Sequence, residues 1–333
     1  MSTRCPQCGA RLAPAIRRCR KCGAPVERKG PVEEVTLARP AGPYASGDQI
    51  AGPYTVIEHH GAGPLGATYR ARTVDGLAVA VKIVTQTLLP TPKERDAFVG
   101  EFRPILGRVM PHVALPLEVG IDRGEHVFVV SPWVHGASLR RIVRAWREAG
   151  RLLSPDQVLG VLQGAAAALR ELHTTTSHGA LYPENIHITA EGVVLTDAAL
   201  AGIVPGARLA EHIERYPEVA AYMAPEVRAG RRCNAGADLH GLGALASELL
   251  TGDPVAARAP GFALPSLGAD VAEAVAGLLA DRPAARAAAL PALLERLARV
   301  AGRASLPPYG QLPGATGDER GEPFPLRPRA PEA

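Results

Sequence analysis

Four of the five cysteines lie within the first 22 residues, in two Cys-x-x-Cys-Gly sequences that could hold one metal ion. They are Cys5, Cys8, Cys19 and Cys22. Each Cys-x-x-Cys turn presents two sulfurs to one metal, and the glycine that follows permits a tight backbone. The spacing predicts a zinc-ribbon over residues 1–25, folded largely by the metal because so short a segment cannot build a core. A redox pair or an unstructured tail is the alternative interpretation.

A glycine-rich sequence and a lysine further along the chain could bind phosphate groups. Gly61, Gly63 and Gly66 lie between two alternating segments, where glycines let backbone amides approach a phosphate closely. Sixteen residues after Gly66, Lys82 ends the sequence Val-Ala-Val-Lys. The chain has only four lysines, so a lysine here indicates a need for a point charge that arginine does not meet.

These two sequences resemble those of the bacterial serine/threonine protein kinases, whose glycine-rich loop and third-strand lysine are arranged in this way. The resemblance continues in order over residues 52–301. Its further landmarks are Glu101 in Phe-Val-Gly-Glu, Asn185 in Tyr-Pro-Glu-Asn, Asp197 in Thr-Asp-Ala-Ala, Glu226 in Met-Ala-Pro-Glu, Asp238, and Arg282 in Arg-Pro. So many landmarks in register are hard to explain by chance.

The resemblance implies a site for ATP and Mg²⁺. In the family the lysine, here Lys82, neutralises the phosphates, and the helix glutamate, here Glu101, orients it. Asn185 and Asp197 would hold Mg²⁺ through oxygen ligands. The predicted nucleotide-binding residues are Gly61, Gly63, Gly66, Ala80, Lys82 and Glu101.

Several departures from the family bear on this site. Thr68 replaces the valine that packs on adenine, and Ala198 and Ala199 replace the phenylalanine and glycine of the metal-binding motif. Pro104 follows Glu101 and is expected to kink the helix that carries it, because proline removes a backbone hydrogen bond. Weak nucleotide affinity is the expected consequence.

The groups that move a phosphate are missing. Where the family has His-Arg-Asp this chain has His178-Gly179-Ala180, so the aspartate that accepts the substrate proton is replaced by a methyl group. The lysine two residues further on is Tyr182, and the threonine before Ala-Pro-Glu is Val219. This joint loss predicts a pseudokinase that binds ATP, is inactive as an enzyme, and serves as a regulatory or scaffolding protein for an unidentified protein partner.

Two other functions stay open. A weakly active or atypical kinase could use Asp197 or Glu184 as a displaced base. Residues 1–30 carry eight Lys/Arg against one Glu, a charge of +7, which leaves −3 of the net +4 for the rest of the chain. This basic segment could bind nucleic acid, although basic residues also offset the negative charge of a four-thiolate zinc site.

The elements that must position these residues follow from the hydrophobic pattern. Strands are expected near residues 54–57, 67–71, 77–84 and 127–130, and a helix from Thr91 past Glu101. Further helices are expected over 138–149, 155–173, 237–251, 269–280 and 287–301. The predicted fold is α+β: a protein-kinase-like bilobal domain over 51–302, with a linker over 26–50 and a disordered Pro/Gly-rich tail over 303–333. In the family's packing Glu226 and Arg282 pair, Asp238 caps the catalytic loop, and His178 packs beneath it.

Composition agrees with a globular chain of this kind. At 333 residues and 47% hydrophobic content the chain is long enough to bury a core. No apolar run approaches the roughly 18 residues of a membrane span, and the N-terminus does not resemble a signal peptide. A cytoplasmic location without a membrane partner is the expectation.

Overall fold

The computed structural model describes residues 42–307. The predicted zinc-ribbon with its four cysteines, the basic segment, most of the predicted linker and residues 308–333 of the predicted tail lie outside the described residues. Zinc binding and nucleic-acid binding by residues 1–30 therefore stay predictions. No helix within 42–307 is long and apolar enough to span a membrane.

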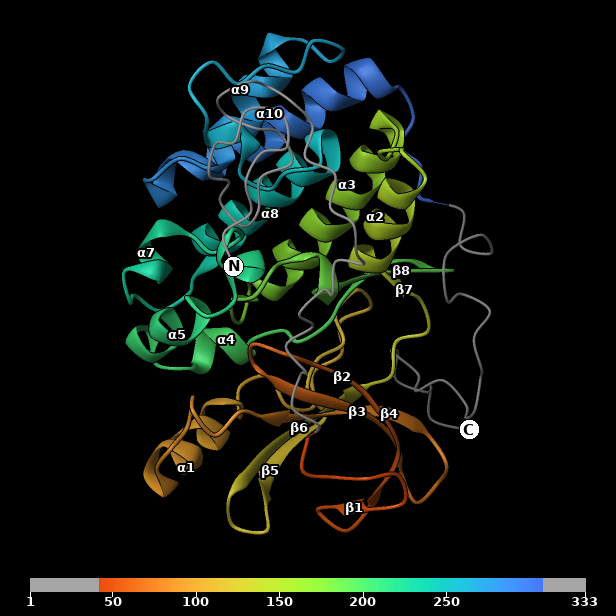
Figure 1. The fold of residues 1–333 in the computed structure, drawn as a ribbon, viewed down its shortest axis with the longest axis vertical. Helices are drawn as coiled ribbons and strands as arrows, with labels where there is room; N and C mark the ends of the chain where they lie inside the picture. The colour runs from red at the N-terminus through yellow and green to blue at the C-terminus, as the bar shows by residue number, and fades with distance from the viewer. Residues whose placement is uncertain (1–41, 308–333) are drawn as a thin grey trace, which may run out of the picture. The chain divides into compact units, whose positions relative to one another are not determined.

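The first lobe is an antiparallel sheet with one flanking helix (Figure 1). Its strands lie in the order β1-β2-β3-β4-β6-β5. They are β1 (Gln49–Ile50), β2 (Tyr54–Gly63), β3 (Gly66–Arg72), β4 (Ala78–Val84), β5 (Glu118–Asp122) and β6 (His126–Pro132). The four predicted strands are confirmed as parts of β2, β3, β4 and β6.

Helix α1 (Pro92–Glu101) begins as the sequence predicts and ends earlier. The Thr91 hydroxyl accepts from the Glu94 backbone N–H at 3.3 Å, and the Glu94 carboxylate accepts from the Thr91 N–H at 3.0 Å, which completes the capping box. The expectation that the helix runs past Glu101 is wrong. Pro104 lies beyond the helix, so it does not kink it; the chain continues in turns from Phe102.

Residues 42–50 belong to the sheet lobe rather than to a linker. Strand β1 pairs with β2, and Tyr44 and Ile50 are buried in the outer core of the sheet. The Tyr44 backbone N–H donates to the Tyr69 hydroxyl at 3.2 Å. The predicted start of the kinase-like domain at residue 51 is therefore too late. The Pro/Gly-rich composition of this segment gives no sign that Tyr44 and Ile50 are buried.

The second lobe is helical, with a small sheet at the side that faces the first lobe (Figure 1). Its long helices are α2 (Leu139–Glu148), α3 (Pro155–Leu172), α8 (Ala235–Thr251), α9 (Ala269–Leu278) and α10 (Pro283–Ala301). All five agree with the prediction, with ends that differ by a few residues. The small sheet has the order β7 (Ala137–Ser138), β8 (Ile186–Thr189), β9 (Gly192–Leu195).

Shorter elements connect the long helices. They are η1 (Pro183–Asn185), α4 (Leu200–Ile203), α5 (Gly206–Ile213), α6 (Pro217–Ala220), α7 (Pro225–Arg228) and η2 (Ala256–Arg258). The start of the predicted tail is ordered against α3, since the Ser305 N–H donates to the Asp156 carbonyl at 3.1 Å and Leu306 packs on the core. The predicted end of the domain at residue 302 is therefore too early, because residues 303–307 pack with it.

The buried ion pair of the helical lobe uses a different arginine from the one predicted. Arg286 donates to both carboxylate oxygens of Glu226, at 2.7 and 2.9 Å, and is fully buried. Arg282, the predicted partner, is exposed at the N-terminal cap of α10. The correction arises because Arg286 lies one turn further into the helix, on the side that faces Glu226.

His240, in α8, gives the lobe a pH-dependent stability. The ring is fully buried, with Nδ1 3.2 Å from the Tyr222 carbonyl and Nε2 3.1 Å from an Arg258 nitrogen. Nδ1 therefore donates and Nε2 accepts, which requires a neutral ring. Burial first, and then the Arg258 charge, lowers the pKa of His240 from 6.5 to about 4.

We expect the free energy of unfolding to fall as the pH is lowered from 6.5 towards 4. Over this pH range the ring is protonated in the unfolded state and stays neutral in the folded state. His240 therefore lowers the free energy of unfolding by on the order of 2–3 kcal/mol. Urea unfolding at pH 7 and pH 4.5 measures it, and His240→Gln should reduce the pH dependence. The exposed His59 provides the control, and an unchanged pH dependence in His240→Gln would contradict the assignment.

Candidate functional site

Lys82 and Ala80 lie on the side of the sheet that faces the helical lobe. In β4, these two are the only half-buried residues among buried neighbours. Thr68 lies opposite Lys82 in the register of β3 and β4, and it is the only half-buried residue in the interior of β3. Strand alternation thus brings the three predicted nucleotide-facing positions to one surface.

The glycine-rich turn joins β2 to β3 through Pro64 and Leu65. Gly66 has φ +147°, and a Cβ there would meet the Ile83 carbonyl oxygen at 2.0 Å, so no other residue fits. Cβ atoms at Gly61 and Gly63 would meet nothing within 4 Å. These two glycines leave open space beside the backbone, as a phosphate site needs.

Lys82 contacts Asp197 rather than Glu101. Its ammonium donates to the Asp197 carboxylate, and both side chains are largely buried. Glu101 instead accepts from Arg232 at 2.9 Å, with both side chains about half exposed. The predicted Lys82–Glu101 pair is wrong for this structure, because α1 ends at Glu101 and its carboxylate points to the segment before α8.

The turn at Asp197 places two residues other than glycine in a left-handed backbone conformation. Asp197 has φ +59° and Ala199 has φ +70°, a left-handed conformation that costs roughly 1–2 kcal/mol for a residue with a Cβ. Ala198 and Ala199 are fully buried, and the Ala199 N–H donates to the His178 carbonyl at 3.1 Å. Core packing therefore offsets the strain and holds Asp197 at the interlobe surface.

Asn185 is buried between the catalytic-loop segment and the Asp197 turn. Its side-chain amide donates to the Ala180 carbonyl at 2.9 Å, and its backbone carbonyl accepts from the Thr196 N–H at 3.0 Å. The first bond uses the NH₂ group and leaves the side-chain oxygen as an acceptor. The Asn185 backbone is thus hydrogen-bonded to Thr196, the residue that precedes Asp197.

The catalytic-loop backbone is fixed in the predicted way. Asp238, itself buried, accepts from the backbone N–H of His178 and of Gly179, both at 2.8 Å. Gly179 has φ +80°, and a Cβ there would lie 2.6 Å from the Gly202 nitrogen, which excludes an arginine at this position without a shift. His178 is fully buried, and burial lowers its pKa. The predicted structural roles of Asp238 and His178 are confirmed.

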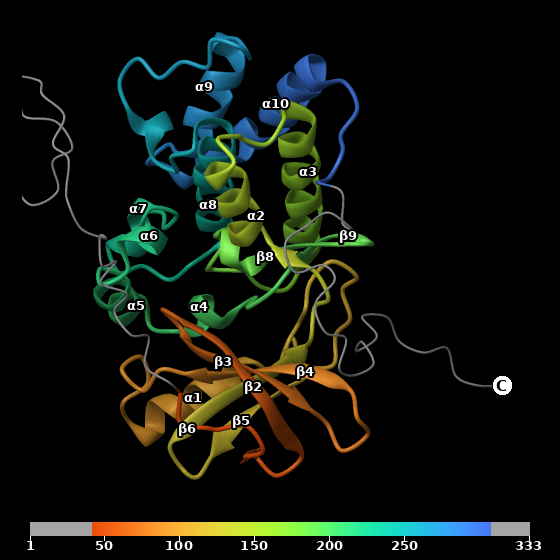
Figure 2. The same ribbon diagram turned by 45° about the vertical axis from the view of Figure 1, so that its right-hand side comes forward.

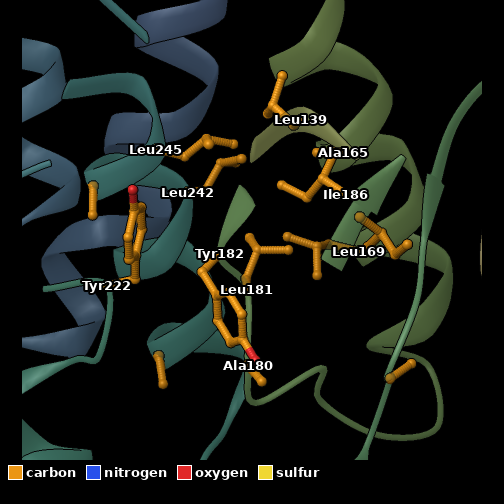
Figure 3. Close-up of a cluster of buried hydrophobic side chains, with 14 of the residues drawn as sticks. Leu139, Ala165, Leu169, Ala180, Leu181, Tyr182, Ile186, Tyr222, Leu242 and Leu245 are labelled. Atoms are coloured by element: carbon orange, nitrogen blue, oxygen red, sulfur yellow. The ribbon is translucent and has the colours of Figure 1, made fainter. Parts of the chain in front are cut away.

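The positions that have lost catalytic side chains are filled by the hydrophobic core. Ala180 is 3% exposed, Tyr182 4% and Val219 4%, and all three belong to the main core cluster. Figure 3 shows Leu181 between Tyr182 and Leu169, with Ala180 close to the ring of Tyr182. These three side chains therefore pack in the hydrophobic core of the helical lobe.

The two candidate substitute bases are already engaged. One oxygen of the Glu184 carboxylate accepts from Arg140 at 3.0 Å, and Arg140 also donates to the buried Glu248 at 2.9 Å. The Asp197 carboxylate accepts from Lys82. Each carboxylate is thus held in an ion pair, and this geometry does not favour either residue as the substitute base.

A segment without any recognised motif holds the glycine-rich turn. In α5, His212 is buried and its Nε2 lies 2.6 Å from the Pro64 carbonyl oxygen, while Nδ1 lies 3.3 Å from the Thr87 hydroxyl. Arg208 of the same helix donates to Glu94 of α1 at 2.8 Å. Figure 2 shows α5 just above and to the left of the end of the β2–β3 hairpin. Sequence reasoning missed this contact, since no local pattern marks a histidine that meets a turn 148 residues away.

An antiparallel sheet lobe and a helical lobe meet at a lysine, an aspartate and a glycine-rich turn, which defines a two-lobed kinase-like fold. Residues 54–263, more than half of the chain, match the family model for the protein kinase domain. The chain belongs to the protein kinase family, whose domain implies nucleotide binding.

Curated relatives are bacterial serine/threonine kinases. PkaB of Streptomyces coelicolor is 29% identical over 229 residues, which covers 65% of this chain and 53% of that protein. PknK of Mycobacterium tuberculosis is 31% identical over 260 residues, which covers 70% of this chain and 22% of that protein. Serine/threonine-protein kinase A of Synechocystis is 25% identical and is covered over 41% of its length. The chain thus spans at most about half the length of these relatives.

Solved structures share the fold. The kinase domain of Mycobacterium tuberculosis PknI matches with a TM-score of 0.60 and 22% identity, over 76% of this chain and 99% of that one. A second crystal structure of the same domain gives a TM-score of 0.61 at 21% identity. At this identity the likeness shows the bilobal fold alone.

Proposed function

We propose that this protein is a pseudokinase: a kinase-like domain that binds ATP with Mg²⁺ and acts in regulation or scaffolding rather than in phosphotransfer. The observation that carries the proposal is a division within one loop. Ala180 and Tyr182 are packed in the core, whereas Asn185, five residues after Ala180, keeps its side-chain oxygen as an acceptor beside the Asp197 turn. The transfer machinery is lost and the binding groups are kept.

The residues present fit a nucleotide with its metal. Mg²⁺ is usually held by one or two protein oxygens together with waters and phosphate oxygens, and Asn185 and Asp197 supply that number. Open space at Gly61 and Gly63 leaves room for phosphates against the backbone. Lys82 contacts the Asp197 carboxylate, and its ammonium has further N–H groups that could contact a phosphate. ATP and Mg²⁺ are the cofactors this arrangement would take.

A regulatory role follows from what surrounds the site. The α5 helix is fastened to the glycine-rich turn by His212 and to α1 by Arg208. A nucleotide bound under the glycine-rich turn would contact the same backbone that His212 contacts. Nucleotide binding would therefore bias the surface that the α4–α6 segment presents. The partner that reads the surface is a protein in this proposal.

We expect Lys82→Ala to abolish a nucleotide-dependent thermal shift. At a ligand concentration ten times the Kd, binding stabilises by about 1.4 kcal/mol, or about 3–5 °C for a domain of this size. Melting curves with ATP, with and without Mg²⁺, measure the effect. Lys93→Ala is the matched control, because Lys93 is the other lysine of the domain and lies exposed on α1. An equal shift in both variants would contradict the proposed role of Lys82.

The weakly active kinase is distinguished by transfer rather than by binding. Purified protein with labelled ATP and Mg²⁺ should incorporate no label that depends on Lys82. Losing a positioned base alone costs roughly 10²–10⁴ in rate. Label that appears in the wild type and disappears in Lys82→Ala would refute the pseudokinase proposal while leaving nucleotide binding intact.

A further inference from the structure

A cavity of about 450 Å³ lies apart from the predicted nucleotide site, under the end of α1. Its walls come from the turn after α1, the loop after α3, α4 and the segment before α8. Of the predicted nucleotide residues only Glu101 borders it. The volume is in the range of about 300–1,000 Å³ that is typical of small-molecule sites.

The polar wall of the cavity is rich in hydrogen-bond donors. Thr175, Thr176 and Ser177 are consecutive, half-buried, and all border the cavity. The hydroxyl contacts that Thr175 and Thr176 make are weak ones of 3.4 Å with their own chain neighbours, which leaves these groups able to turn to a ligand. Hydroxyl hydrogens rotate to suit an acceptor, so three adjacent hydroxyls can meet several oxygens of one group.

An arginine, Arg232, borders the same cavity as these hydroxyls. The Arg232 guanidinium donates to Glu101 at 2.9 Å and to the Ile203 carbonyl at 3.4 Å. The Arg232–Glu101 pair is about half exposed, and such pairs contribute little stability. A guanidinium held this loosely can exchange its carboxylate for a phosphate, which it binds with the same fork geometry.

We propose that this cavity binds a small molecule through a phosphate group, which Arg232 and the Thr175–Ser177 hydroxyls contact in place of Glu101. Apolar side chains of Pro104, Ile105 and Ile203 line the rest of the space and accept the remainder of the ligand. The walls come from both lobes, so an occupied site favours the arrangement in which they face each other. The proposal does not depend on nucleotide binding at Lys82.

Titration of the full chain with inorganic phosphate at constant ionic strength tests the site, read from the backbone amide NMR signals of residues 175–177. We expect saturable shifts there. Arg232→Gln should weaken the apparent affinity at least about tenfold, since it removes a charge-assisted hydrogen bond. Glu101→Gln should tighten it by about two- to fivefold, because it removes the competing carboxylate.

Two control variants distinguish phosphate bound in this cavity from phosphate bound elsewhere on the protein. Arg231 is exposed, adjacent in sequence and outside the cavity wall, so Arg231→Gln matches the charge change and should leave the affinity within about twofold. Lys82→Ala should likewise leave the shifts of residues 175–177 unchanged. The proposal is overturned if the signals do not saturate, if Arg231→Gln weakens binding as much as Arg232→Gln, or if only Lys82→Ala removes it.

Discussion

Replacing Arg286 by alanine lowers the free energy of unfolding by about 3–5 kcal/mol, the loss expected when one partner of a buried ion pair is removed. Glu226 is 8% exposed and would keep a buried charge without its counter-ion. Arg286 also donates to the carbonyls of Ala280, Gly236 and Asp281, at 2.7, 2.9 and 3.2 Å. The substitution therefore removes the donor of several partly buried carbonyl groups as well as the counter-ion of Glu226.

Urea unfolding followed by circular dichroism measures this loss. Arg282→Ala is the matched control, because Arg282 is exposed and should change stability by no more than about 0.5 kcal/mol. Arg286→Lys keeps the charge and loses the fork that meets both Glu226 oxygens, so it should fall between the two. Equal losses for Arg282→Ala and Arg286→Ala would contradict the pairing in the structure.

Restoring the aspartate of the catalytic loop, by Ala180→Asp, does not restore phosphotransfer and costs about 3 kcal/mol of stability or more. Ala180 is 3% exposed within the main core cluster, next to Leu181 and Tyr182. A carboxylate placed there is either charged without a partner or protonated with a raised pKa, and both are unfavourable. The lysine that would support transfer is still absent, since Tyr182 fills its place.

Thermal and urea unfolding measure the cost, and labelled ATP measures transfer. Ala180→Asn separates volume from charge, because asparagine has nearly the size of aspartate without its charge and should lose less stability at neutral pH. A variant Ala180→Asp that is as stable as the wild type and transfers phosphate would show that this position still faces a substrate. That result would contradict the proposal that the catalytic site has become part of the core.

Much of the fold could be predicted because its signals are local. The five long helices follow from apolar residues spaced three and four apart, and Thr91 and Glu94 mark the start of α1 through contacts within one turn. Asp238 and His178 were placed by motif, and the structure confirms both. The Pro/Gly composition of residues 42–50 predicted a linker, whereas burial of Tyr44 and Ile50 attaches this segment to the sheet.

The partners of charged residues could not be predicted in the same way. Sequence order suggests Arg282 for Glu226 and Glu101 for Lys82, yet the structure pairs Arg286 with Glu226 and Asp197 with Lys82. One turn of helix decides the first pair, and the end of α1 decides the second. Residue type does not predict either pair, because Arg282 and Arg286 are both arginines and Glu101 and Asp197 are both carboxylates.

The sequence by itself determined the family, the missing catalytic groups and the retained Lys82, Asn185 and Asp197, because each depends on residue type at a fixed spacing. Only the tertiary structure decided that Ala180 and Tyr182 are core residues, that His212 holds the glycine-rich turn, and that Arg232 takes Glu101 at the rim of a cavity. The contacts of His212 and Arg232 join residues more than a hundred positions apart in the chain, and packing between elements, rather than any local preference, brings them together.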